Sequence, residues 1–270
     1  MSFIKPLVKD WLPPVLFRAV RQLNGKGIRF EGSYKSWEEA AALCTGYDAE
    51  SILDKVLEAT LKVKRGEAAF ERDSVLFDEI QYSWPVTAAL MWAAARNNGE
   101  LHVLDFGGSL GSSYFQNRKF LSKLRRNSWT VVEQRNFVKI GMDQISDGVL
   151  NFNSDIDECC MSLSPNLVLL SSVLQYLPAP FSVLESLAQK QVGLIIVDRT
   201  PFSNDKIEKI KIQHVPEKIY SASYPCWFFN LDDFIQKMIY FNYRLVESFD
   251  ALDNLSDQAK WQGLIFEKAE

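Results

Sequence analysis

Histidine and cysteine, the side chains that most often bind transition metals, are scarce in this 270-residue sequence. The two histidines are His102 and His214, and the four cysteines lack the paired Cys-x-x-Cys spacing of a zinc site. We therefore expect no metal site. The cysteines show no disulfide framework either, so they indicate reduced thiols in a cytoplasmic protein.

Long apolar runs and an excess of basic residues are also absent. No run of about 18 apolar residues occurs, so the sequence predicts no transmembrane helix. The formal net charge of −4 argues against general nucleic-acid binding. With 47% hydrophobic and 24% charged residues, the composition is that of an ordinary globular protein. The length suffices for one large domain, or for one domain with a helical cap.

Basic residues outnumber acidic ones in residues 1–35, where apolar side chains follow helical spacing. The apolar residues are Ile4, Leu7, Val8, Trp11 and Leu12. A basic amphipathic helix that carries tryptophan can lie on an anionic membrane surface. The sequence therefore allows peripheral membrane contact through residues 1–30. Packing of this helix on its own domain is the alternative.

Residues 36–97 are predicted to be largely helical. Helical spacing indicates three helices, over 37–43, 51–63 and 85–96. Ser36 can cap the first of them, because Glu39 follows three positions later, as in a capping box. We therefore expect residues 1–97 to form an amphipathic and helical N-terminal cap.

Strands and helices alternate from residue 98 onward, which predicts a parallel sheet with right-handed crossovers. Five strands are predicted over 101–106, 128–132, 149–152, 167–170 and 192–197, and helices over 113–126, 135–145, 181–189 and 230–240. Two further strands, 243–249 and 262–267, form a terminal hairpin. The predicted fold is α/β, with a Rossmann-like, seven-stranded, mostly parallel sheet over 98–270. Its last strand is antiparallel, and the N-terminal helical cap precedes it.

One long segment, residues 200–229, interrupts this alternation. Loops of such length inside a compact domain are usually functional or disordered, and the many aromatic residues argue against disorder. Because the segment follows the fifth strand, it belongs at the carboxyl edge of the sheet. We expect a loop-like insert that walls a substrate pocket.

The first predicted strand of the sheet ends in a glycine turn, followed by the start of a helix. Glycine lets a backbone approach a ligand closely, and a helix start offers unpaired N–H groups. Counted from Gly107, the dinucleotide fingerprint Gly-x-Gly-x-x-Gly fails at its third and sixth positions. An NAD-type oxidoreductase is therefore disfavoured, although it stays an alternative.

The same residues resemble motif I of the S-adenosylmethionine-dependent methyltransferases that have a Rossmann-like fold. That motif is an acidic residue, x, Gly, x, Gly, x, Gly. Here it reads Asp105, Phe106, Gly107, Gly108, Ser109, Leu110, Gly111, with serine at the middle glycine position. The resemblance implies that S-adenosyl-L-methionine is the cofactor and that this loop binds it.

Three later strand ends supply further candidate cofactor contacts. Glu133 closes the second strand, where a carboxylate can accept hydrogen bonds from both ribose hydroxyls, and a solvated strand-end glutamate is the alternative. In methyltransferases that this chain resembles, the segment after the third strand contacts adenine. The resemblance implies Asp155 as acceptor for the exocyclic amine and Ile156 as cover for the ring, with an exposed loop as the alternative. Ser171 begins a segment that resembles motif IV.

Over nearly its whole length the chain resembles a family of methyltransferases that is often encoded with surface-polysaccharide genes in bacteria. The segments that carry this resemblance are Leu12-Pro13-Pro14, Phe30 to Tyr34 with Trp37, Gly46-Tyr47-Asp48, Leu104 to Gly111, and Tyr224 to Trp227. It implies methylation in polysaccharide biosynthesis, with a sugar nucleotide or a lipid-linked glycan as acceptor. A catalytically silent module that binds a partner or a membrane is the alternative, because no obvious catalytic motif accompanies the loop.

A hydroxyl acceptor needs a base to take its proton during methyl transfer. His214 is the first candidate, because its ordinary pKa near 6.5 suits that role, and a structural histidine is the alternative. Asp198, at the end of the fifth strand, and Tyr224, in the insert, are reserve candidates. His102 lies within the first strand of the sheet and is predicted to be structural.

Overall fold

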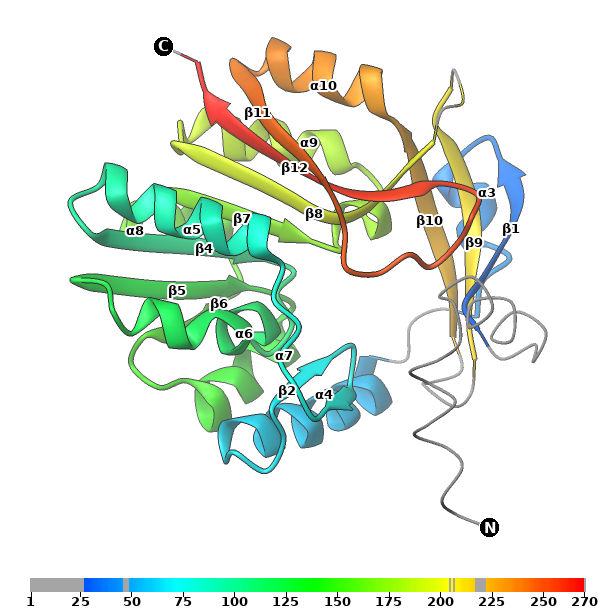
Figure 1. Ribbon diagram of the computed structural model, residues 1–270. Coiled ribbons are helices and arrows are strands. Elements are labelled where there is room, and N and C mark those ends of the chain that lie inside the picture. Colours follow the sequence, from blue (N-terminus) through cyan, green and yellow to red (C-terminus); the bar gives the residue numbers. More distant parts are fainter. Residues whose placement is uncertain (1–26, 46–48, 204, 206, 217–221, 270) are drawn as a thin grey trace, which may run out of the picture.

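The computed structural model describes residues 27–45, 49–203, 205, 207–216 and 222–269 (Figure 1). Most of the predicted amphipathic N-terminal segment, and with it the expected membrane contact, lies outside the described residues. The segments Leu12-Pro13-Pro14 and Gly46-Tyr47-Asp48 lie outside them too.

The predicted seven-stranded sheet is confirmed. Its strands are β4 (Glu100–Phe106), β5 (Arg126–Val132), β6 (Leu150–Asn153), β7 (Leu167–Ser171), β8 (Leu194–Ser203), β11 (Tyr243–Asp250) and β12 (Lys260–Lys268). They lie in the order β6-β5-β4-β7-β8-β12-β11. The first five are parallel, whereas β12 runs antiparallel to β8 and to β11.

Helices cover both faces of this sheet and bury two separate apolar clusters (Figure 1). One face packs against α4 (Ala49–Lys64), α5 (Trp84–Arg96), α6 (Ser112–Leu121) and α7 (Arg135–Ile140), which continues as a π-helical turn (Gly141–Ile145). The other packs against α8 (Ile156–Leu163), α9 (Pro180–Gln189) and α10 (Leu231–Tyr240). No helix in the described ranges has the length and apolar character needed to cross a membrane.

The segment 200–229 is not the loop that we expected. It contains the end of β8 followed by β9 (Lys209–Val215) and β10 (Ala222–Asn230), which pair antiparallel. β10 joins the end of β8, and β1 (Arg29–Tyr34) joins β9, so the sheet widens to ten strands. The reason is visible in the alternation from Lys209 to Ile212, whose isoleucines pack beneath the short helix α3 (Trp37–Ala41).

The N-terminal region is only partly helical. Ser36 caps α3 as predicted, because its hydroxyl accepts a hydrogen bond from the Glu39 amide at 3.2 Å. However, β1 is a strand, and a hairpin of β2 (Phe70–Arg72) and β3 (Val75–Phe77) separates α4 from α5. Both α4 and α5 bury their apolar residues in the same cluster as the sheet.

Candidate functional site

Four polar side chains lie on one face of the sheet, near the points where β5, β4 and β7 end and where β8 stops pairing with β7. They are Glu133, Asp105, Ser171 and Asp198, in the spatial order β5, β4, β7, β8. The residues two positions earlier all lie in or against the apolar cluster beneath α4 and α5: Val131, Val103, Leu169 and Ile196. Because side chains alternate along a strand, the four polar residues continue that face at its carboxyl end. We call them the polar row.

The glycine loop presents bare backbone beside this row. Gly107 and Gly111 have φ of 72° and 93°, which disfavours residues with a Cβ. A Cβ at Gly108 would collide with the Asp105 carboxylate, although Gly108 has no positive φ. Ser109, at the middle position of the motif, also has a left-handed φ of 55°. Serine therefore keeps the loop geometry that glycine usually supplies, at some conformational cost.

Asp105 is fully buried under this loop. The Trp129 indole N–H donates to Asp105 Oδ2 at 2.9 Å, and no donor among the described residues reaches Asp105 Oδ1. Burial raises the pKa of Asp105 to about 7, and the charge of Glu133 adds to the rise. A buried acceptor without a donor is costly, so a ligand or water that donated a hydrogen bond to this oxygen would stabilise the structure.

Glu133 stands across from the glycine loop. Burial raises its pKa, and hydrogen bonds from the backbone of Gln134 and Ser109 oppose that rise. Ser109 belongs to the loop, so the carboxylate and the loop lie together. Asp155 caps α8, because its Oδ1 accepts from the Glu158 amide at 2.9 Å. Ile156 is partly buried against the opposite apolar cluster.

The three predicted catalytic residues are not brought together. Asp198 is the last residue of β8 that pairs with β7. Tyr224 lies on β10, opposite Gln213 of β9. His214 neighbours Gln213 on β9, so it points to the other face, where its Nε2 lies 2.7 Å from Glu31 Oε1. His102 contacts Ser128 Oγ through Nδ1 at 2.6 Å, within the sheet.

Tyr224 reaches the strand ends indirectly. Tyr176 lies in the short 3-10 helix η2 (Leu174–Tyr176), just after β7. Its hydroxyl donates to Gln213 Oε1 at 2.9 Å, and its ring packs edge-on against the Tyr224 ring at 5.2 Å. The Gln213 amide in turn donates to the Tyr224 hydroxyl at 3.2 Å.

Arg199, which sequence reasoning missed, ties three distant segments together at the middle of β8, where the pairing with β7 stops. Its Nε donates to Asp253 Oδ2 at 2.8 Å and its Nη2 to Asp73 Oδ2 at 2.6 Å. Arg72 lies 3.1 Å from the other Asp253 oxygen. We call these four residues the arginine clamp. It joins the β2–β3 hairpin and the β11–β12 connection to the sheet edge.

Glu71 of the same hairpin is a second residue that the sequence did not single out. It is buried against the start of α6, where the Ser112 hydroxyl donates to its Oε1. Burial raises the pKa of Glu71 to about 7. The hairpin therefore places a carboxyl group directly beside the residues that follow the glycine loop.

Three of the nine non-glycine residues with a left-handed φ in the described part of the chain lie at the same edge. Ser109, Ser172 and Arg199 have φ of 55°, 56° and 53°, although none is glycine. Ser109 lies in the loop after β4, and Ser172 directly follows β7. Arg199 directly follows the last residue of β8 that pairs with β7. Such conformations cost roughly 1–3 kcal/mol each and tend to cluster where ligands bind.

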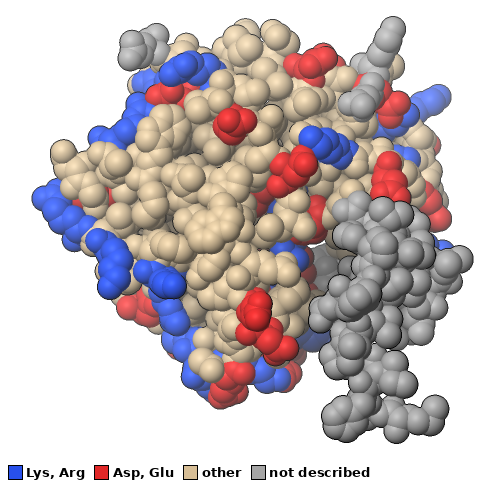
Figure 2. All heavy atoms as spheres, viewed as in Figure 1, with Lys and Arg blue, Asp and Glu red and all other residues tan. Residues whose placement is uncertain are grey.

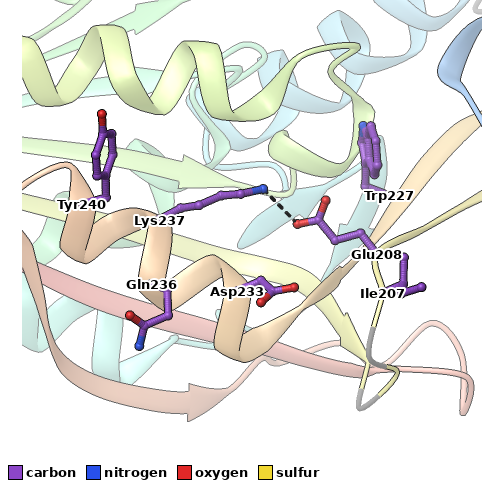
Figure 3. A pocket seen from close by; sticks show the side chains of 7 residues that line it. All are labelled: Ile207, Glu208, Trp227, Asp233, Gln236, Lys237 and Tyr240. Atoms are coloured by element: carbon purple, nitrogen blue, oxygen red, sulfur yellow. Dashed lines mark hydrogen bonds and ion pairs between the residues drawn. The ribbon is translucent and has the colours of Figure 1, made fainter.

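A hollow of about 530 Å³ lies elsewhere, between α10 and the residues that flank β9 (Figure 3). Its lining includes Trp227, Glu208 and Lys237, with the last two 3.4 Å apart. The Trp227 ring stacks against both Trp37 and Phe229, with ring centroids 6.2 Å apart in each pair. The hollow contains no member of the polar row.

Charge is unevenly spread on the face seen in Figure 2. Basic side chains gather along one rim, on the side away from the strand ends, and acidic side chains lie across the middle and toward the strand ends.

Comparison with known proteins gives no family model and no curated protein that matches the chain. Solved structures do match. One is an O-methyltransferase from neocarzinostatin biosynthesis in complex with S-adenosyl-L-homocysteine and 1,4-dihydroxy-2-naphthoic acid, with 13% identity and a TM-score of 0.46. The match covers 68% of this chain and 52% of that one, so the chain spans about half its length.

Two further solved structures match the chain; one was determined in the presence of a sugar, and the other is that of a sugar methyltransferase. The N-terminal domain of EvdMO1, in the presence of S-adenosyl-L-homocysteine and D-fucose, has 13% identity and a TM-score of 0.47 over 79% of this chain and 96% of that one. CalS10, an amino pentose methyltransferase from Micromonospora echinaspora, has 9% identity and a TM-score of 0.46 over 70% and 92%.

Proposed function

We propose that this protein is a class I S-adenosylmethionine-dependent methyltransferase. Its proposed acceptor is a hydroxyl group of a saccharide, a sugar nucleotide or a related small molecule. The observation that carries the proposal is the bare-backbone glycine loop over the buried Asp105, with Glu133 facing the loop from the next strand.

The residues present suit this donor. Glu133 would accept hydrogen bonds from the ribose hydroxyls, and the loop from Gly107 to Gly111 would pass under the methionine part. The unpartnered Asp105 Oδ1 would accept from the donor's ammonium group, directly or through water. Asp155 and Ile156 would adjoin the adenine ring, and Ser171 would border the sulfonium.

When bound, S-adenosylmethionine supplies a methyl group already activated by the positive sulfur. The protein then has to align the acceptor, exclude water and take up the acceptor's proton. Asp198 lies in the polar row, whereas His214 faces the other side of β9. The geometry therefore favours Asp198 over His214 as the proton acceptor.

The wider context stays a prediction. It includes a division into a cap over 1–97 and a catalytic domain over 98–270, a role in polysaccharide biosynthesis, and a cytoplasmic location with peripheral membrane contact through residues 1–30. A glycan acceptor linked to a lipid would agree with such a contact.

Calorimetry with S-adenosylhomocysteine tests the donor site. We expect micromolar binding by the wild type and at least a tenfold loss, about 1.4 kcal/mol, in Glu133→Ala. Glu247→Ala, which removes an exposed carboxylate from β11, is the matched control and should bind as the wild type does. A folded wild-type protein that binds no donor product would exclude the proposed function, and binding without methyl transfer to any acceptor would favour the silent module.

A further inference from the structure

The sheet has a notch beside the middle of β8. Up to Asp198, β8 pairs with β7, and from Phe202 it pairs with β10 on the same side. Meanwhile β12 pairs along the other side of β8. Residues 199–201 therefore lack a strand neighbour on the β7 side, and the η2 turn lies there instead.

Gln175 of η2 fills this notch. Its side chain is fully buried, and its Nε2 donates to the Arg199 carbonyl at 3.1 Å and to Ser172 Oγ at 3.2 Å. These two bonds orient the amide, so its Oε1 has a defined position. No described residue donates a hydrogen bond to that oxygen.

Asp198 supplies the second unpartnered oxygen of this notch, in addition to that of Gln175. The residue is 5% exposed, and its Oδ2 accepts from Ser171 Oγ at 3.4 Å. No described donor bonds to Oδ1. Two buried acceptors without donors each cost roughly 1–3 kcal/mol, and a ligand that offers two donors would recover that energy.

The notch lies at the correct end of the polar row for an acceptor. Glu133, at the ribose position, and Asp198 are separated by three strand-to-strand steps, roughly 14 Å at about 4.8 Å per step. The methionine part of the donor would lie between them, over β4 and β7. The arginine clamp closes the β8 end, because Arg199 follows Asp198 directly and holds the hairpin through Asp73.

We propose that Asp198 Oδ1 and Gln175 Oε1 form the acceptor subsite and that they bind a hydroxyl group flanked by a second hydrogen-bond donor, as in a sugar diol. This inference rests on the proposed methyltransferase function. As the acceptor oxygen gains the methyl group and the donor leaves as a neutral thioether, the hydroxyl proton passes to Asp198. Gln175 holds the neighbouring hydroxyl and so determines specificity.

Sinefungin tests the subsite without knowledge of the acceptor, because its amino group stands where the transferable methyl group does. We expect the wild type to bind sinefungin at least tenfold more tightly than S-adenosylhomocysteine, measured by calorimetry. Asp198→Asn should lose at least tenfold of that preference while binding S-adenosylhomocysteine as the wild type does. The exposed Asp232→Asn on α10 is the matched control and should keep the preference.

The outcomes separate the two proposals. If the wild type binds neither compound, the methyltransferase function itself fails. If both bind and the preference is absent, or survives in Asp198→Asn, the donor site stands and the acceptor subsite is refuted. A Gln175→Met variant that stays folded should lower sinefungin affinity and leave that of S-adenosylhomocysteine unchanged.

Discussion

Replacing Asp105 by asparagine should change the stability of the protein in a pH-dependent way. The carboxyl group is fully buried, and its pKa rises from 3.8 to about 7 on folding. Between about pH 4 and pH 7 the folded protein keeps this proton while the unfolded chain has lost it. Stability from this group is therefore fully present below about pH 4 and is lost as the pH rises through about 7.

The magnitude follows from the size of the rise in pKa. At roughly 1.4 kcal/mol per pKa unit, the buried carboxyl group lowers the free energy of unfolding by about 4 kcal/mol above pH 7. At pH 5 this loss is roughly 2–3 kcal/mol smaller. Asparagine cannot titrate, and its oxygen can still accept from the Trp129 indole. Its amide N–H groups lack a partner, which costs roughly 1–3 kcal/mol at any pH.

Urea unfolding at pH 5 and at pH 8, followed by tryptophan fluorescence, measures this effect. We expect Asp105→Asn to be more stable than the wild type at pH 8 and equal or less stable at pH 5. Glu71 and Asp198 also titrate, but they do so in both proteins, so the difference reports Asp105 together with its repulsion from Glu133. A difference in unfolding free energy that is the same at both pH values would refute the assignment of the raised pKa.

Two further substitutions test the loop and the clamp. Gly111→Ala should destabilise the protein by about 1–3 kcal/mol in thermal unfolding, because φ is 93° and the new Cβ would lie 2.8 Å from Leu150 Cδ2. Gly66→Ala, with φ of 76° but open space, is the control, and an equal loss there would show that crowding at Leu150 is unimportant. Arg199→Met should cost roughly 1–3 kcal/mol, because it removes one of the two cationic partners of the nearly buried Asp253, which keeps Arg72, and the partner of the exposed Asp73. Arg125→Met, which removes an exposed ion pair, should stay within about 1 kcal/mol, and similar losses for both arginines would contradict a buried clamp.

Local pattern was enough to predict most of the sheet. The strand at 101–106, its glycine turn and the helix after it depend on residues near one another in the chain, and the structure contains all three. The antiparallel end of the sheet followed from two apolar strands joined by a polar turn. Ser36 as a helix cap is likewise a local contact, and it is present.

The errors arose where a strand needed a distant partner. β1 and β9 are partly polar, so their strand structure depends on distant partners: β1 pairs with β9, and β9 also pairs with β10. Local pattern therefore predicts a loop for the aromatic segment 200–229, although the structure contains strands there. The β2–β3 hairpin was missed for the same reason, since its three-residue strands carry almost no periodic pattern.

The sequence by itself determined the residue types at the strand ends, because a motif with Asp105, Gly107 and Gly111 depends only on local spacing. It also determined that Glu133 directly follows a strand, whereas Asp198, expected at a strand end, lies within β8, which continues to Ser203. Only the tertiary structure decided which of these side chains share a face, and it separated His214 from Tyr224 by a single position of strand alternation. The arginine clamp joins residues 54 and 126 positions apart, and no local signal specifies such a pair. The unpartnered oxygens of Asp198 and Gln175 exist for the same reason, since burial and the absence of a donor are properties of the packed molecule.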